Sequence, residues 1–393
     1  MVCLRTRYFR VNRLLLLMVG LWPYKQSKIT RLQLILFQSI LLSLVLFQLS
    51  SFLTSKCTAQ FAIEVFSGVF PIIGFMIKYN MYSLNFNYVK YLLELIQYTC
   101  DELKDKSEVA ILEEYGKTGK RYINVLAPIG IIGLLIFLSY PFLMIILDII
   151  SPTNKPGSLT QLQFVTEYFV DREKYFYLIL LHTNIAYCIG YSALLAVGTM
   201  NLTYFQLICG MFKISSYRVK KAMMIYTLEI SNTRNQQLVQ QNISYGVDMH
   251  RKAMWIINVY TSKMEIFYFF LIISGIASCS LNLFRIFQLL SSDINIVKLT
   301  FPCITLIVFY IYTIIAMNCA QQITDHNDDM FATAYNVKWY MAPLNIQKTI
   351  LFMLQKGTKP FHVNLGGIFI ASLENCTKLM SISMSYFTVL CSM

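Results

Sequence analysis

The residues of this sequence that are best suited to chemistry are the ionisable side chains inside long apolar stretches. Glu374 and Lys378 lie four residues apart in the last apolar stretch, so on a helix they share one face and can pair. Arg285 and Glu64 lie near the ends of two other apolar stretches. A charge inside a bilayer is costly, so such residues mark functional positions or helix contacts. The pair at 374 and 378 fits either a self-neutralising helix contact or a polar channel lining.

The sequence contains no arrangement typical of an enzyme. It has no G-x-S-x-G, H-E-x-x-H, Walker A or C-x-x-C motif, and His182, close to Asn184, has no nucleophile to act with. The ten cysteines are scattered and the four histidines lie far apart, which indicates neither a disulfide framework nor a zinc site. We therefore expect a protein that is not an enzyme and has no metal or cofactor.

The composition indicates a membrane protein with several spans. Hydrophobic residues make up 56% of the 393 residues, charged residues only 13%, and the mean hydropathy is +0.54. Soluble globular domains carry about 25% charged residues. Runs long enough to cross a bilayer predict seven helical spans. They are 32–53, 61–81, 123–150, 176–204, 264–290, 298–320 and 364–390.

The basic residues predict the orientation of these spans. The segment before the first span and the second, fourth and sixth loops carry 25 of the 33 Lys and Arg residues. Basic residues favour the cytoplasmic side, so we expect the N-terminus inside and the C-terminus outside. The same pattern explains the net charge of +13 without a nucleic acid partner. The second and fourth loops, with the fourth and sixth spans, have amphipathic patterns that predict helices continuing into the cytoplasm.

The C-terminal part carries a combination of short motifs. Trp339 and Tyr340 precede Pro343, Gln347-Lys348 precedes an apolar helix, Lys359-Pro360 breaks the chain, and residues 385–390 read Ser-Tyr-Phe-Thr-Val-Leu. Pro343 suits the start of a helix over 344–355, and Gly357 and Pro360 suit its end. Together these motifs resemble the C-terminal signature of insect odorant receptors. Residues 167–171, 181–184 and 210–213 resemble the same family, and the whole looks most like the tuning receptors of hymenopteran insects.

The resemblance implies an all-α membrane protein with seven helices and cytoplasmic extensions that form an anchor domain. It implies a transmembrane bundle that binds ligand over residues 1–320, and an anchor helix with a pore-lining seventh span over 321–393. Four subunits, including a shared co-receptor, would then surround a cation pore of weak selectivity. Matching positions imply a hydrophobic gate at Val389 and Met393, with Tyr386 one turn deeper, which stops ions by dewetting.

The resemblance also implies a ligand pocket in the outer half of the second, third, fourth and sixth spans. Its residues recur at three or four positions within each span, so each set can share a face, and they suit a small volatile or hydrocarbon-like ligand. Core packing explains each of them equally well. They are Phe66, Phe70, Ile73, Gly133, Ile136, Phe137, Tyr140, Ile179, His182, Thr183, Ala186, Phe301, Ile304 and Thr305.

The function expected on this basis is that of an odorant receptor subunit in the plasma membrane of an olfactory sensory neuron dendrite. A seven-helix receptor coupled to G proteins is the alternative, but the loop charges predict the opposite orientation. A transporter would show internal symmetry, which this sequence lacks. A gustatory receptor has a similar architecture but a different C-terminal signature.

Overall fold

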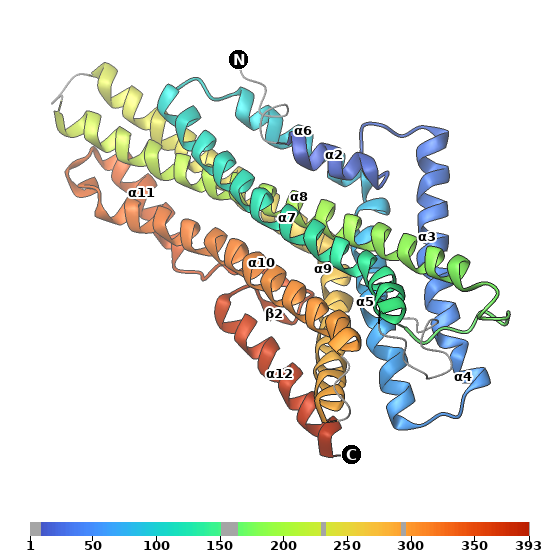
Figure 1. Cartoon of the computed structure of the whole chain (residues 1–393). Helices are drawn as coiled ribbons and strands as arrows, with labels where there is room; N and C mark the ends of the chain where they lie inside the picture. Colours follow the sequence, from blue (N-terminus) through green and yellow to red (C-terminus); the bar gives the residue numbers. More distant parts are fainter. Residues whose placement is uncertain (1–8, 151–163, 229–232, 292–295, 393) are drawn as a thin grey trace.

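The chain folds into a bundle of long helices, several of which extend far beyond the bundle on one side (Figure 1). The computed structural model describes residues 9–150, 164–228, 233–291 and 296–392. The larger helices are α2 (Arg10–Met18), α3 (Lys28–Leu49), α5 (Ala59–Ser83), α6 (Phe86–Asp101), α7 (Lys106–Ile150), α8 (Phe176–Leu228), α9 (Thr233–Ser291), α10 (Ile296–Asn336), α11 (Leu344–Gly357) and α12 (Leu373–Ser392). Short elements are α4 (Ser51–Thr54), η2 (Trp339–Met341) and the strands β1 (Asn364–Leu365) and β2 (Phe369–Ile370).

Six helical segments in the described residues are long and apolar enough to cross a membrane, and they match the first six predicted spans. Helices α8 and α9 have 53 and 59 residues, which at 1.5 Å per residue corresponds to about 80–90 Å. The hydrocarbon core of a bilayer is only about 30 Å thick. The nearly all-helical fold is therefore confirmed, together with the prediction that spans continue as helices beyond the bilayer.

The predicted seventh span is wrong at its start. Residues 364–370 form an antiparallel hairpin, in which Asn364 pairs with Ile370 and Leu365 with Phe369, and helix α12 begins only at Leu373. Gly366 and Gly367 have φ values of +62° and +69°, which side chains with a Cβ rarely adopt. The apolar run hides this break, because glycine adds little to a hydropathy pattern but changes the backbone.

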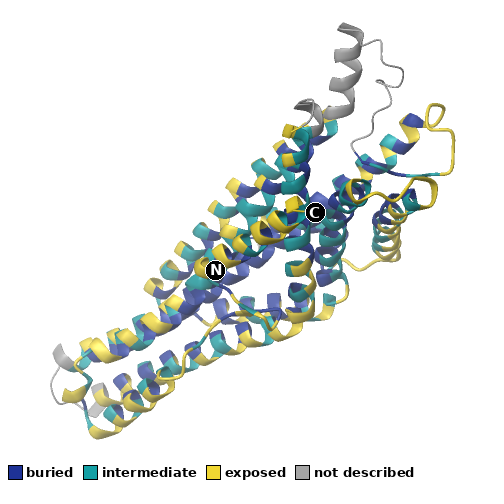
Figure 2. Cartoon of the chain, turned by 90° about the horizontal axis from the view of Figure 1, so that it is seen from below, coloured by how far each residue is buried: buried dark blue, intermediate teal, exposed yellow. Residues whose placement is uncertain are grey.

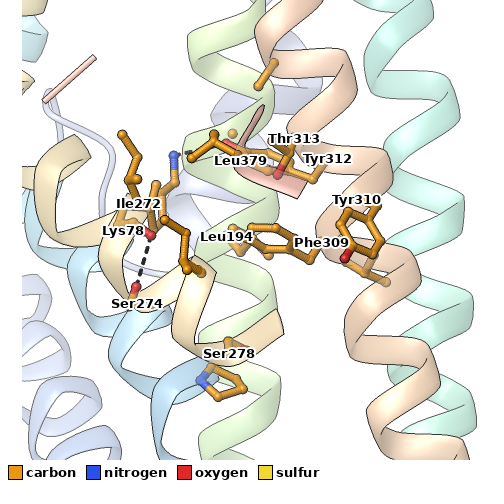
Figure 3. Close-up of a pocket in the computed structure, with 18 of the residues that line it drawn as sticks. Lys78, Leu194, Ile272, Ser274, Ser278, Phe309, Tyr310, Tyr312, Thr313 and Leu379 are labelled. Atoms are coloured by element: carbon orange, nitrogen blue, oxygen red, sulfur yellow. Dashed lines mark hydrogen bonds between the residues drawn. The ribbon is translucent and has the colours of Figure 1, made fainter. Parts of the chain in front are cut away.

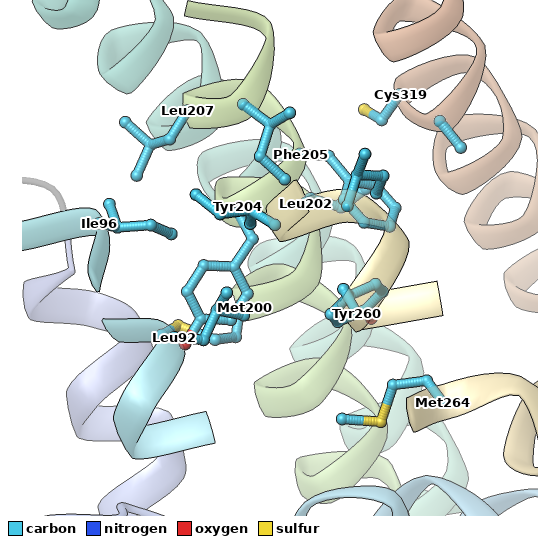
Figure 4. Packing of buried hydrophobic residues seen from close by; sticks show 14 of the residues in the cluster. Leu92, Ile96, Met200, Leu202, Tyr204, Phe205, Leu207, Tyr260, Met264 and Cys319 are labelled. Atoms are coloured by element: carbon cyan, nitrogen blue, oxygen red, sulfur yellow. The ribbon is translucent and has the colours of Figure 1, made fainter. Parts of the chain in front are cut away.

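Helix α8 occupies the centre of the molecule and packs against α5, α7, α9 and α10. Its side chains Met200, Tyr204 and Leu207 are buried with Leu92 and Ile96 of α6, as Figure 4 shows. In Figure 2 the exposed residues follow the outer faces of the long helices, while buried residues face the bundle interior. Each long helix thus buries one face against its neighbours and exposes the other.

Side chains of α9 bond to the turn of α5 that precedes Pro71. Pro71 lies within α5 and has no N–H to donate to the carbonyl of Ser67, one turn earlier. Asn282 of α9 donates its Nδ2 to that carbonyl at 3.3 Å, and Arg285 donates to the Ser67 hydroxyl at 3.3 Å. Arg285 also pairs with Glu64 at 3.0 Å. These contacts compensate the lost backbone bond and fix the two helices against each other.

The helical extensions converge on a separate apolar cluster. Val219 of α8, Ile243 of α9, Met330 of α10 and Ile350 of α11 are buried together. Helix α11 begins directly after Pro343 and ends at Gly357, close to its predicted range. We call this four-helix region, residues 219–228, 233–243 and 330–357, the anchor bundle.

Ion pairs connect the first turn of α7, and Asp105 just before it, to α8. Glu108 accepts two bonds from the Arg218 guanidinium, at 2.6 and 2.8 Å, and Asp105 pairs with Lys221 at 2.6 Å. The hydrogen bond from Lys221 lowers the pKa of the Asp105 carboxyl. The Glu108–Arg218 pair is mostly shielded from solvent and bidentate, so it fixes geometry better than an exposed pair.

Candidate ligand cavity and pore helix

A cavity of about 170 Å³ lies within the bundle between α5, α8, α9, α10 and α12. On α10 its lining extends from Phe301 to Ala320, a rise of about 28 Å. Figure 3 shows Lys78, Leu194, Ile272 and Tyr312 around it, one from each of α5, α8, α9 and α10. Apolar cavities of about 150 Å³ bind benzene, so the space suits a small organic ligand. Most of its lining is aromatic or aliphatic.

Three of the predicted pocket residues line this cavity: Phe70, Phe301 and Thr305. Phe301 and Phe137 belong to an aromatic cluster with Phe164 and Tyr187. Phe301 meets Phe164 edge-on at 4.5 Å between ring centroids, and Phe137 lies 4.5 Å from Tyr187. Tyr187 itself lines the cavity, so the cluster borders the end of the cavity near Phe301.

Other predicted pocket residues pack elsewhere. Ile136 is exposed on α7, while Gly133 faces Ile304 of α10 across the α7–α10 contact. Phe66 packs against Phe52 and Phe70. Phe66 and Ile73 both border a cluster of buried apolar side chains that includes Val69. Ile179, Thr183 and Ala186 are buried along α8 but do not line the cavity. The side chain of Tyr140 lies outside the described residues.

His182 is engaged in a hydrogen-bond chain between α8, α3 and the segment that precedes α8. Its Nδ1 lies 2.7 Å from the Tyr168 hydroxyl and its Nε2 lies 2.9 Å from the Ser43 hydroxyl. Burial raises the pKa of Tyr168 to about 12. The Ser43 hydroxyl also donates to the Ile40 carbonyl at 2.9 Å. Both ring nitrogens of His182 therefore have hydrogen-bond partners within the protein.

Lys78 is the principal cavity residue that sequence reasoning missed. It is 1% exposed, donates to the Tyr312 hydroxyl at 3.0 Å, and lies 5.3 Å from the ring centroids of both Tyr268 and Tyr312. Beside it, Asn201 donates to Tyr268 at 3.5 Å and accepts from Tyr82 at 2.6 Å. A signal existed, because Lys78 is a lone cation in the span 61–81.

Helix α12 has two faces of different character. Its buried face, with Cys376, Leu379, Met380 and Ser383, lines the cavity. Its other face is exposed in the single chain and carries a series of hydroxyls at helical spacing, which donate back to their own helix. These are Thr377, Ser381, Ser385, Thr388 and Ser392. The resulting surface is polar, which explains why α12 does not count among the six apolar spans.

The predicted gate residues Tyr386 and Val389 lie on the exposed side of α12, 58% and 55% exposed, so they do not pack within their own chain. Met393 lies outside the described residues. Glu374 and Lys378 form the predicted ion pair at 2.7 Å on the same exposed side. Two bonds tie α12 to its neighbours: Gln321 of α10 accepts from the Leu373 N–H at 2.9 Å, and Ser280 of α9 donates to the Ser383 carbonyl at 3.0 Å.

Comparison with known proteins identifies the fold. The chain has a TM-score of 0.81 with the structure of the insect olfactory receptor OR5 from Machilis hrabei in complex with eugenol, at 14% identity over 99% of this chain and 98% of that one. A second structure of the same receptor gives 0.78, at 13% identity over 98% and 97% of the two chains. No curated protein matches the sequence significantly.

The family model described as 7tm Odorant receptor matches residues 58–384. The match begins just before α5 and ends within α12, so it includes every helix that lines the cavity. The sequence motifs that resemble odorant receptors therefore occur in a chain that matches the family model and has the fold of an insect olfactory receptor. The chain belongs to the odorant receptor family of insects, whose members are ligand-gated cation channels.

Proposed function

We propose that this chain is the odorant-binding subunit of a heterotetrameric, weakly selective cation channel that contains a co-receptor subunit. It acts in the plasma membrane of olfactory sensory neuron dendrites, where odorant binding depolarises the cell. The metabotropic alternative is not favoured, because the family match covers most of the chain. The ligand is a small volatile or hydrocarbon-like molecule. The similar receptor from Machilis hrabei has a structure with eugenol, which makes eugenol a reasonable first probe.

The observation that carries this proposal is the position of α12. The face with Leu379 and Ser383 lines the cavity, and the opposite face has the hydroxyl series and Val389. A ligand shifts a closed–open equilibrium only when it binds the open form better. A ligand beside Leu379 touches α12 directly, so the contacts of the ligand change when α12 moves. Such a ligand can therefore bind the closed and open forms with different affinity.

The exposed face of α12 suits a pore wall. Four copies of Val389 near the axis would form a hydrophobic constriction, which excludes ions by dewetting. The hydroxyls of Thr377 and Ser381 would line a wet vestibule below it, since each keeps lone pairs free for water. No ring of carboxylates lies at the level of Val389, which suits weak selectivity among cations.

We assign the end of the molecule that carries the anchor bundle to the cytoplasm, with the C-terminus outside. The proposed functional division is a ligand-binding bundle over 1–320 and an anchor helix with the pore helix over 321–393, although α10 continues through residues 320 and 321. The anchor bundle exposes an apolar surface suited to contacts between subunits. It consists of Tyr340, Met341, Leu344, Leu351 and Phe352.

A voltage-clamp comparison tests the proposal. The chain expressed with the co-receptor should give odorant-evoked cation currents under an odorant panel that includes eugenol. The chain alone should give none, because the proposed pore needs co-receptor subunits. Strong odorant currents from the purified chain alone in lipid would contradict the heterotetramer. A response that required G proteins would contradict the channel.

A further inference from the structure

Lys78 has hydrogen-bonding capacity that the protein leaves unused. An ammonium group has three donors, and the Tyr312 hydroxyl is the only acceptor that the described residues offer within hydrogen-bonding distance. The other neighbours are the ring faces of Tyr268 and Tyr312. In the described part of the chain, no carboxylate lies within 4.0 Å of its Nζ. The side chain is nonetheless 1% exposed.

This arrangement is unusual for a buried charge in a membrane bundle. Desolvation of an ammonium is expensive unless a counter-ion and further hydrogen bonds compensate it, and ring faces compensate only part. Elsewhere in this chain the buried Arg285 has its carboxylate, Glu64, at 3.0 Å. Lys78 points instead into a cavity. Its missing counter-ion is therefore expected to come from a molecule that occupies that cavity.

We infer that the cavity takes a small organic acid whose carboxylate pairs with the Lys78 ammonium. The inference rests on the proposed function, since it names the chemical class of the ligand for the same cavity. Phe70, Leu194 and Phe309 provide the apolar lining for the tail of the acid. The attraction between the two charges is strong at this depth because little water screens it.

The charge and size of the cavity favour a carboxylate over other anions. Lys78 is the only ionisable cation among the lining residues, so a dianionic phosphate would keep one charge uncompensated. The remaining polar groups near it, Asn201 and Tyr268, are neutral. A volume of about 170 Å³ accommodates a short aliphatic or a single-ring acid. Lys78 thus acts as a residue that determines specificity.

The test compares three probes with equal numbers of non-hydrogen atoms: hexanoic acid, methyl pentanoate and heptan-1-ol. Currents are recorded from the chain with its co-receptor at one fixed pH, with the acid dosed by its carboxylate concentration. We expect the acid to have the lowest half-maximal concentration. Lys78→Met should raise that value at least tenfold for the acid and change it less than about twofold for the ester and the alcohol. Lys78→Arg should keep the preference for the acid.

The control is Lys90→Met, because Lys90 is half-exposed on α6, away from the cavity, and its loss should change none of the responses. Lys78→Gln, which can still bond to Tyr312, replaces Lys78→Met if that variant does not reach the cell surface. Currents with the neutral probes but no preference for the acid would overturn the acid site and leave the proposed function standing. Equal shifts for all three probes in Lys78→Met would overturn it too. Wild-type chain at the surface with no current for any odorant would overturn the proposed function itself.

Discussion

Phe301 contributes at once to packing and to the cavity wall. It is 5% exposed, contacts Phe137, Phe164 and Tyr187, and lines the cavity at the start of α10. Thr305, one turn along α10, lines it as well. A substitution at Phe301 therefore alters the shape of the cavity and leaves the exposed face of α12 unchanged.

Phe301→Ala should change which odorants activate the channel. The lost ring enlarges the cavity, so longer or bulkier ligands should gain potency relative to short ones, while conductance and ion preference stay constant. Dose–response curves for a homologous series, with reversal potentials, measure both. Phe→Ala in a core costs about 3–5 kcal/mol, so Phe301→Leu provides a milder variant with the same expected direction. A changed reversal potential with unchanged odorant ranking would contradict this assignment.

Val389→Ser should have the opposite effect. A small polar side chain at the proposed constriction eases wetting, so leak current should rise and ion preference should change, with the odorant ranking unaltered. Val125→Ser is the matched control, because Val125 is 52% exposed on α7, much as Val389 is 55% exposed on α12. In the proposed heterotetramer, co-receptor subunits would reduce the size of the effect. A Val389→Ser variant that changed only odorant ranking would contradict the separation of cavity and pore.

At the scale of elements, the hairpin β1–β2 positions the start of α12. A Cβ on Gly366 would lie 2.6 Å from the Phe269 backbone nitrogen of α9, and the residue has a φ of +62°. The Ala371 N–H bonds to the Val363 carbonyl at 2.8 Å, which closes the hairpin next to α12. Only glycine fits this close approach, so the hairpin holds α12 against α9.

Gly366→Ala should therefore destabilise the receptor. The left-handed backbone costs about 1–2 kcal/mol for a residue with a Cβ, and the collision with α9 adds to this. Thermal unfolding of the detergent-purified protein should show a lower midpoint. Gly130→Ala is the control, since a Cβ there meets Leu195 at ordinary distances of 3.7 Å or more, and alanine favours helix. Equal midpoints for the two variants would contradict the role given to the hairpin.

At the scale of the whole molecule, the structure separates two regions along the long helices. The cavity and α12 lie at the end of the molecule where the C-terminus is found, and the anchor bundle lies at the far end of α8, α9 and α10 (Figure 1). Under the proposed function, ligand binding and subunit assembly would use different parts of the chain.

The proposed orientation has a direct test. An epitope tag placed after Met393 should be stained on intact cells, while a tag before Met1 should need permeabilisation, because basic residues keep the N-terminal side in the cytoplasm. Asn242, within a sequon on α9, should carry no glycan. Staining of the C-terminal tag only after permeabilisation, or a glycan on Asn242, would contradict this orientation.

The sequence by itself determined the class of the protein, its family and six of its spans. Run length and the low share of charged residues decide the class and the spans, because the bilayer imposes a minimum helix length and excludes charge. The family came from the resemblance of short motifs. The motifs around Pro343 and at residues 385–390 can also be read from the sequence, since each consists of neighbouring residues. Pro343 and Gly357 bound α11 almost as predicted, because helix caps depend on neighbouring residues only.

Only the tertiary structure decided which residues meet in the cavity. Periodicity assigns a face to each helix but does not say which neighbour that face contacts, so Ile136 and His182 were expected at the cavity and lie elsewhere. Lys78 and the inward face of α12 reach it because α9 and α12 pack beside α5 and α10. Those contacts depend on the rotation of helices far apart in the chain, and no local pattern encodes that rotation.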